Sequence, residues 1–270
     1  GRLSYGRHET PMKRLGETVD LFWHSQLGQN RSITAVGSGS GPGFDVMLSN
    51  AIAYDSPRIG GVQVSALYAA DHDLVDPNPG ADDDSEDAIG LSLTYRAEDG
   101  PWFAGFAFES HAIPESLGAS IDREKALRVA LMWEDQGLKF TAFSQYSFDE
   151  GFIRGNDRLS YGLGTAYRDG ADTFKLQWYR AQTSREIAEN GGWLLALGVD
   201  HAFTEATSTY VAFALLKPDV HARSNQAGFA FDTGLDLGAQ GHFETHALAL
   251  DDSNRARRQV GLSLGMRHIF

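Results

Sequence analysis

Apolar and polar residues alternate with a period of two along most of this chain. Between positions 123 and 134, Leu127, Val129, Leu131 and Trp133 fall on one face, and charged or small residues fall on the other. A helix would instead repeat its apolar residues three and four positions apart. The same alternation recurs at 88–96, 138–149, 160–168, 173–181, 193–203 and 259–270. The pattern therefore predicts an all-β protein made of long strands.

The segments that join these strands alternate between short and long. Short turns are expected at 58–61, 98–100, 135–137, 169–171 and 204–206, and long polar connections at 9–48, 71–86, 111–122, 150–158, 183–192 and 217–255. In an outer-membrane barrel, short turns lie on the periplasmic side and long loops lie outside. Strands of about 9–12 residues also suit a tilted crossing of the bilayer. We therefore expect an antiparallel transmembrane β-barrel.

Composition agrees with a barrel and narrows its partners. The 270-residue chain has no apolar stretch long enough for a transmembrane helix, and its mean hydropathy is only −0.31, as expected when each strand has one apolar face. The formal net charge of −13 argues against a nucleic-acid partner and favours a lumen that tolerates cations. There is no cysteine, which excludes disulfides and thiolate chemistry. The first residues, GRLSYGR, resemble the middle of a strand and not a signal peptide, so we expect a mature or truncated chain.

The charged and glycine-rich segments carry no motif for catalysis or metal binding. The acidic stretch 71–87 lacks the ligand spacing of a calcium loop, so we interpret it as a solvated loop or as a place where divalent cations bridge lipopolysaccharide. The zinc-protease motif H-E-x-x-H does not occur. The segment 37–43 lacks the end of a phosphate-binding loop and is interpreted as flexible. We expect no catalytic residue, no cofactor and no metal.

Three segments resemble those of the Gram-negative general diffusion porins. Gly1–Pro11 resembles the strand that leads into their constriction loop, Asn50–Gly61 the strand and turn after it, and Gly261–Phe270 their terminal strand. The resemblance implies a usually trimeric, sixteen-stranded barrel in the outer membrane of a Gram-negative bacterium. One strand precedes the long loop here and eleven follow it, so we expect a single porin domain over 1–270 with about twelve strands, lacking the first four. Phe270 would then be part of the signal that the barrel-assembly machinery reads.

The resemblance also implies a pore constriction. In the resembling porins, the third loop folds into the barrel and its acidic residues face basic residues on the wall; the corresponding loop here is 9–48. The candidate residues are Glu17, Asp20 and Asp45 on the loop, with Arg7, Arg128 and Lys175 on the strands. The alternatives are ordinary solvated loop charges, and an ion pair of Arg128 with Glu124 or Glu134.

These observations predict a passive channel for ions and small hydrophilic solutes, in contact with membrane lipid and lipopolysaccharide. A substrate-specific outer-membrane channel is one alternative, and it would need an aromatic track or a dense cluster of one charge in the lumen. The inward-facing Phe103, Phe143 and Tyr179 are too scattered to form such a track. A soluble secreted β-sandwich that binds a partner is another alternative, but the alternation of short and long connections speaks against it.

Overall fold

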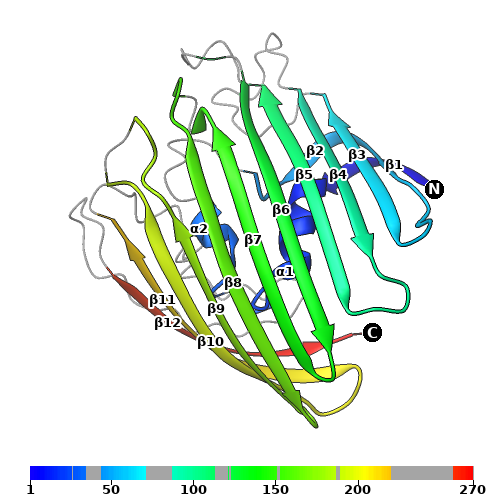
Figure 1. Ribbon diagram of the computed structural model, residues 1–270, viewed down its shortest axis with the longest axis vertical. Coiled ribbons are helices and arrows are strands. Elements are labelled where there is room, and N and C mark those ends of the chain that lie inside the picture. Colours follow the sequence, from blue (N-terminus) through cyan, green and yellow to red (C-terminus); the bar gives the residue numbers. More distant parts are fainter. Residues whose placement is uncertain are drawn as a thin grey trace.

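In the part of the chain that the structure describes, twelve antiparallel strands form one sheet, and each strand pairs with its neighbours in the sequence. The computed structural model describes residues 1–25, 27–34, 44–70, 87–112, 121, 123–150, 153–186, 189–219 and 258–269. The sheet curves into a wall with two short helices on its inner side (Figure 1). The expected all-β antiparallel architecture is confirmed. The strands are β1 (Arg2–Glu9), β2 (Met47–Asp55), β3 (Val62–Ala69), β4 (Ala88–Arg96), β5 (Trp102–Ala112), β6 (Arg123–Asp135), β7 (Leu138–Phe148), β8 (Arg158–Asp169), β9 (Asp172–Ala181), β10 (Gly192–Ala202), β11 (Thr207–Pro218) and β12 (Gln259–His268).

Short and long connections alternate along the sheet, as the sequence predicted. A two-residue turn joins β6 to β7 through Gln136 and Gly137, whose φ angles are 48° and 82°. A two-residue turn with both φ angles positive matches the right-handed twist of the strands that it joins, and it favours glycine. The long connections leave the opposite end of the wall, because consecutive strands run antiparallel.

The distribution of apolar and polar side chains over the two faces of the sheet is the reverse of that in a soluble protein. The outer face carries exposed apolar side chains, such as Leu163 at 62% exposure and Val129 at 46%. The inner face buries polar side chains, including Arg128 and Gln177 at 0% exposure. An apolar outer face and a polar inner face are what a strand needs when it lies between lipid and an aqueous lumen. The single described sheet also lacks the second packed layer of a β-sandwich.

The helix α1 (Pro11–Val19) lies against the inner face. Thr10 caps it by accepting a hydrogen bond from the Lys13 amide at 3.1 Å, and Pro11 occupies the first turn. Met12, Leu15 and Val19 form a buried stripe at helical spacing. The wall makes room for this stripe with small residues, since alanines at 107, 126 and 130 are fully buried. No helix among the described residues is long and apolar enough to cross a membrane.

The two edges of the sheet are β1 and β12, which do not pair with each other in the described residues. On β12, Leu262, Leu264 and Met266 are exposed on the outer face and Ser263 is buried on the inner face, as the alternation predicted. Three segments singled out by the sequence lie outside the described residues: the acidic stretch 71–86, the glycine-rich 37–43 and the terminal Phe270.

Candidate functional site

The described parts of the connection between β1 and β2 lie against the inner face of the wall. Its first part, α1, contacts β3 to β7, and its second helix, α2 (Arg31–Thr34), contacts β9 and β10. This one connection therefore lies along much of the inner surface (Figure 1). We call its described residues, 10–25, 27–34 and 44–46, the inner loop.

Arg128, on β6, ties the inner loop to the wall. Its guanidinium donates to both carboxylate oxygens of Asp45, at 2.6 Å and 2.8 Å, and to the Met12 carbonyl at 2.8 Å. Its Nε donates to Gln145 Oε1 at 3.0 Å, and the guanidinium carbon lies 5.0 Å from the Phe143 ring centroid. One fully buried side chain thus holds both the beginning and the end of the loop.

The alternative pairing of Arg128 with an acid on its own strand is not what the structure contains. Glu124 and Glu134 lie four and six positions away along β6. A strand rises about 3.3 Å per residue, which separates these residues by about 13 Å and 20 Å along the wall. Asp45 reaches Arg128 because the loop brings it across the inner face.

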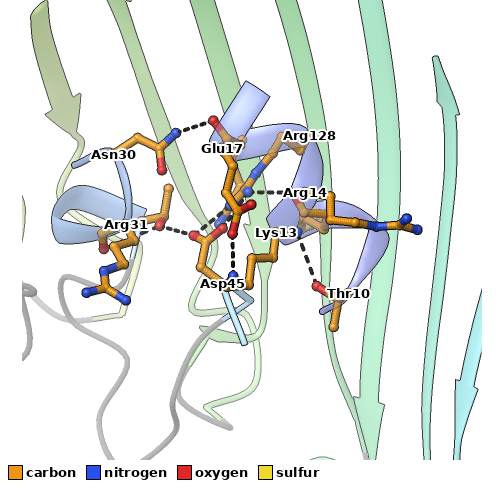
Figure 2. Close-up of polar contacts among 12 residues, drawn as sticks. Thr10, Lys13, Arg14, Glu17, Asn30, Arg31, Asp45 and Arg128 are labelled. Atoms are coloured by element: carbon orange, nitrogen blue, oxygen red, sulfur yellow. Dashed lines mark hydrogen bonds and ion pairs between the residues drawn. The ribbon is translucent and has the colours of Figure 1, made fainter. Parts of the chain in front are cut away.

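Asp45 is held in its charged form by this contact. Thr34 Oγ1 also donates to Asp45 Oδ2, at 2.6 Å. Burial opposes ionisation of Asp45, but the charge and hydrogen bonds of Arg128 outweigh it and keep the pKa of Asp45 below its usual range. In Figure 2, Asp45 lies between α1 and Arg31 of α2. The pair is a fixed ion pair between loop and wall.

Asp20 joins the loop to a different part of the wall. Its carboxylate accepts hydrogen bonds from the amides of Phe22 (2.8 Å) and Asn30 (2.7 Å), and from Gln177 Nε2 on β9 (3.0 Å). Gln177 Oε1 accepts in return from the Leu21 amide at 3.1 Å. Burial raises the pKa of Asp20 to about 6, although these hydrogen bonds act in the opposite direction. Asp20 therefore organises the loop more than it faces a base.

The raised pKa of Asp20 predicts a pH-dependent stability. Protonation of Asp20 is easier in the folded chain than in the unfolded one, so its contribution is complete below about pH 4 and is lost as pH rises through about 6. Asp20→Asn removes the titration. The melting temperature of the variant minus that of the wild type, from far-ultraviolet circular dichroism in detergent, should rise between pH 4 and pH 7. A difference that stays constant over this range would contradict the assignment.

Glu17 and Lys13 pair within α1. Lys13 Nζ bonds to the carboxylates of both Glu9, at the end of β1, and Glu17, one helical turn later in α1. The same ammonium group lies 4.8 Å from the ring centroid of Trp23. Burial raises the pKa of Glu17, with Lys13 opposing the rise. The structure thus brings Glu17 to a lysine of its own helix and not to a base on the wall.

Lys175 and Arg7 occupy separate positions. Lys175 Nζ on β9 pairs with Asp200 at 2.6 Å and lies 4.7 Å from the Phe22 ring centroid, so it stands next to the loop. Arg7 lies exposed on β1, at a register shift between Gly6 and His8. Arg7 makes no contact with a loop acid in the described residues. Of the six candidates, the structure joins only Asp45 and Arg128 directly.

Several residues of this site were missed by the sequence analysis. Gln145 and Gln177 orient the wall contacts, and Lys13 pairs with the carboxylates of Glu9 and Glu17. Both glutamines lie on the inner face of their strands, at alternating positions that the pattern identifies. Because their side-chain amides are neutral, the sequence placed both glutamines on the inner face but did not indicate that they contact the loop or its partners. Within the described ranges, no group of three or more His, Asp or Glu could hold a metal ion.

Gly28 allows the loop to approach the wall closely. Its φ is +85°, its carbonyl accepts from Gln177, and an added Cβ would lie 2.5 Å from the Ala196 Cβ. Gly28→Ala should therefore lift the loop and cost roughly 1–3 kcal/mol. Gly60→Ala is the matched control, because Gly60 also has positive φ (+57°) but has nothing within 4 Å of an added Cβ. In denaturant unfolding, Gly28→Ala should lower the free energy of unfolding more than Gly60→Ala does. Equal losses would assign the whole effect to backbone strain.

Comparisons with known proteins bear on this arrangement. A sequence profile of the Gram-negative porin family matches residues 1–221. The anion-selective porin from Comamonas acidovorans has a similar structure, with a TM-score of 0.69 and 20% identity over 100% of this chain and 74% of that one. OmpF of Salmonella typhi in complex with daunomycin is also similar in structure, with a TM-score of 0.67 and 9% identity over 99% of this chain and 74% of that one. For OmpT of Vibrio cholerae, the TM-score is 0.60 and the identity is 11%, over 99% of this chain and 76% of that one. No curated protein sequence matches.

Proposed function

Since this chain belongs to the Gram-negative porin family, we propose that it passes ions and small hydrophilic solutes by passive diffusion. The chain is an outer-membrane channel protein of a Gram-negative bacterium, and its apolar outer face suits contact with lipid. In a passive channel, the width and charge of the lumen determine what crosses, and no catalytic group takes part. The inner loop, which lies along the wall, is the part of this chain that would determine both.

One observation carries the proposal: Arg128 joins Asp45 and Met12 to the wall at hydrogen-bond distance. A loop that moved freely inside the lumen would give no defined width. A buried ion pair that holds both ends of the loop keeps the loop at a fixed position. We therefore interpret the inner loop as the constriction of the pore.

Selectivity would follow from the charges at this constriction. In this proposal Glu17, Asp20 and Asp45 provide the acidic side, and Arg128 and Lys175 the basic side. Arg7, exposed on β1, would act at the approach to the loop. The proposal is supported by the Arg128–Asp45 contact and by the position of Lys175 beside Phe22 of the loop.

The proposed assembly is a homotrimer that contacts lipid and lipopolysaccharide and is inserted by the barrel-assembly machinery. The exposed apolar side chains on the outer face provide a surface for lipid or for neighbouring copies. Native electrophoresis of the detergent-extracted protein, with and without chemical cross-linking, measures the number of copies. A monomer under both conditions would contradict the trimer and leave the channel proposal intact.

Fractionation followed by planar-bilayer recording tests the channel. The detergent-extracted native protein should produce stepwise conductance that increases in proportion to salt concentration. The reversal potential in a salt gradient then measures ion preference; strong anion preference would contradict the cation tolerance inferred from net charge. A protein that makes no conductance steps would contradict the function itself.

The substrate-specific alternative gains no support from the inner face. Phe103, Phe143 and Tyr179 are buried at 4%, 4% and 1% exposure, so their rings are not available as a track for a solute. Block of the current by one solute at low concentration, with no block by related solutes, would favour that alternative.

A further inference from the structure

A second cluster of buried ionisable side chains lies beside the ends of the inner loop. Glu109 and His111 on β5 and Glu124 on β6 are exposed by 2% or less. His111 and Glu124 are direct partners across the two strands. His111 Nε2 lies 2.7 Å from Glu109 Oε1, and its Nδ1 lies 3.5 Å from Glu124 Oε1. The imidazole therefore bridges two carboxylates, and we call these three residues the histidine cluster.

The histidine cluster contacts both ends of the loop. The ring of Phe44, next to Asp45, stacks on His111 with centroids 5.0 Å apart and an angle of 30°. Thr10, the cap of α1, bonds to the Glu109 carboxylate through its side chain. The two ends are also joined to each other, because the Thr10 amide donates to the Val46 carbonyl at 3.3 Å.

The charge of the cluster depends on His111. Two other charged groups that interact with the cluster already have partners: Arg128, which faces Glu109, pairs with Asp45, and Glu150, which faces Glu124, pairs with Arg158 of β8. Glu109 Oε2 and both oxygens of Glu124 are buried without a hydrogen-bond partner in the described residues. Buried carboxylates are costly unless a cation or a proton compensates them. A protonated His111 is the group placed to compensate Glu109 and Glu124.

We propose that Glu109, His111 and Glu124 are positioning residues that fix both ends of the inner loop to the wall, and that the charge on His111 keeps them in place. The proposal rests on the proposed channel function, in which the inner loop is the constriction. Neutralising His111 at alkaline pH leaves two carboxylates facing each other behind Thr10 and Phe44. The loop ends should then separate from the wall, and the open channel should fluctuate.

His111→Gln tests this in the full-length native protein. Single-channel current of the wild type should be steady at neutral pH and should fluctuate more at alkaline pH. The variant should fluctuate roughly tenfold more often than the wild type at neutral pH and should show no further increase at alkaline pH, because its buried carboxylates have no cation at any pH. His201→Gln is the matched control: His201 also pairs across strands with an acid, Asp172, at 2.8 Å, but both side chains are nearly half exposed. A His111 variant that matches the control would overturn the proposal.

A rescue variant separates a charge effect from a general loss of structure. His111→Gln combined with Glu109→Gln and Glu124→Gln removes the cation together with both carboxylates, so it should restore a steady current that no longer changes at alkaline pH. A triple variant as unstable as the single one would refute the role of charge. If the His111 variant does not fold, Phe44→Leu should still increase fluctuation while keeping the alkaline onset; an unchanged current would count against the loop contact.

Trypsin accessibility gives a readout that does not depend on conductance. In folded protein, cleavage after Arg31 should be slow in the wild type and in His201→Gln, and at least several-fold faster in His111→Gln. If the wild type forms no channels but the three proteins show this cleavage pattern, the proposed function is contradicted and the positioning role still holds. Equal cleavage rates in all three proteins, with channels present, would contradict the positioning role alone.

Discussion

Replacing Arg128 with glutamine should release the inner loop and increase single-channel conductance. Among the described residues, the variant leaves Thr34 as the one hydrogen-bond donor to the buried Asp45 carboxylate. Removing one partner of a buried ion pair typically costs about 3–5 kcal/mol, because the other charge stays uncompensated. The loop also loses the hydrogen bond that the Met12 carbonyl accepts from Arg128 on the wall. On the same preparation, single-channel conductance should rise and the free energy of unfolding in denaturant should fall.

Arg123→Gln is the control for this prediction. Arg123 lies on the same strand and makes two bonds to the Asp87 carboxylate, at 2.8 Å and 3.0 Å, but both side chains are partly exposed. An exposed pair contributes only about 0–1 kcal/mol, so conductance and stability should stay near those of the wild type. If the two variants behave alike, Arg128 has no special part in holding the loop.

Replacing Leu163 with arginine should impair folding into a bilayer. Leu163 lies in the middle of β8 on the outer face and is 62% exposed. A cationic side chain on the lipid face of a barrel costs about 2–4 kcal/mol at the middle of the bilayer. The measurement is the free energy of folding in lipid vesicles, by denaturant titration with tryptophan fluorescence.

Tyr167→Arg controls for depth in the membrane. Tyr167 lies on the same strand and the same face, close to the short turn after β8. Near the interface, the cost of arginine falls to about 0–1 kcal/mol. The loss at position 163 should therefore be clearly larger. Equal losses at both positions would mean that the outer face of β8 does not cross the lipid.

Much of the wall could be predicted from the sequence, because the side-chain period of a strand is two and each strand here has one apolar face. The segment 88–96 matches β4, and the expected turn at 135–137 contains the observed one. The residues Arg128 and Asp45 could be selected because a charge on the inner face of a strand and an acid on the loop are both visible in the pattern. The family resemblance implied that acids of the loop face bases of the wall, but it did not indicate which acid pairs with which base.

The remaining contacts depend on how the loop lies against the wall, which no local pattern encodes. Asp20 was selected as an acid that faces a base, yet its partners are two amides of the loop and the side-chain amide of Gln177. Glu17 was selected on the same ground and is paired with Lys13, four residues away. The histidine cluster was not identified, because its three members lie on two strands and share no sequence motif.

The order in which this protein assembles follows from the difference between wall and loop. Every strand pairs only with its sequence neighbours, so the wall can grow by local steps. The loop bonds instead to residues far ahead in the chain: Asp45 to Arg128, 83 positions later, and Asp20 to Gln177, 157 positions later. The loop cannot complete its docking until β9 is in place. The part of the loop around Met12 and Asp45 can dock once β6 has joined the wall, and the part around Asp20 can dock only after β9 has joined it.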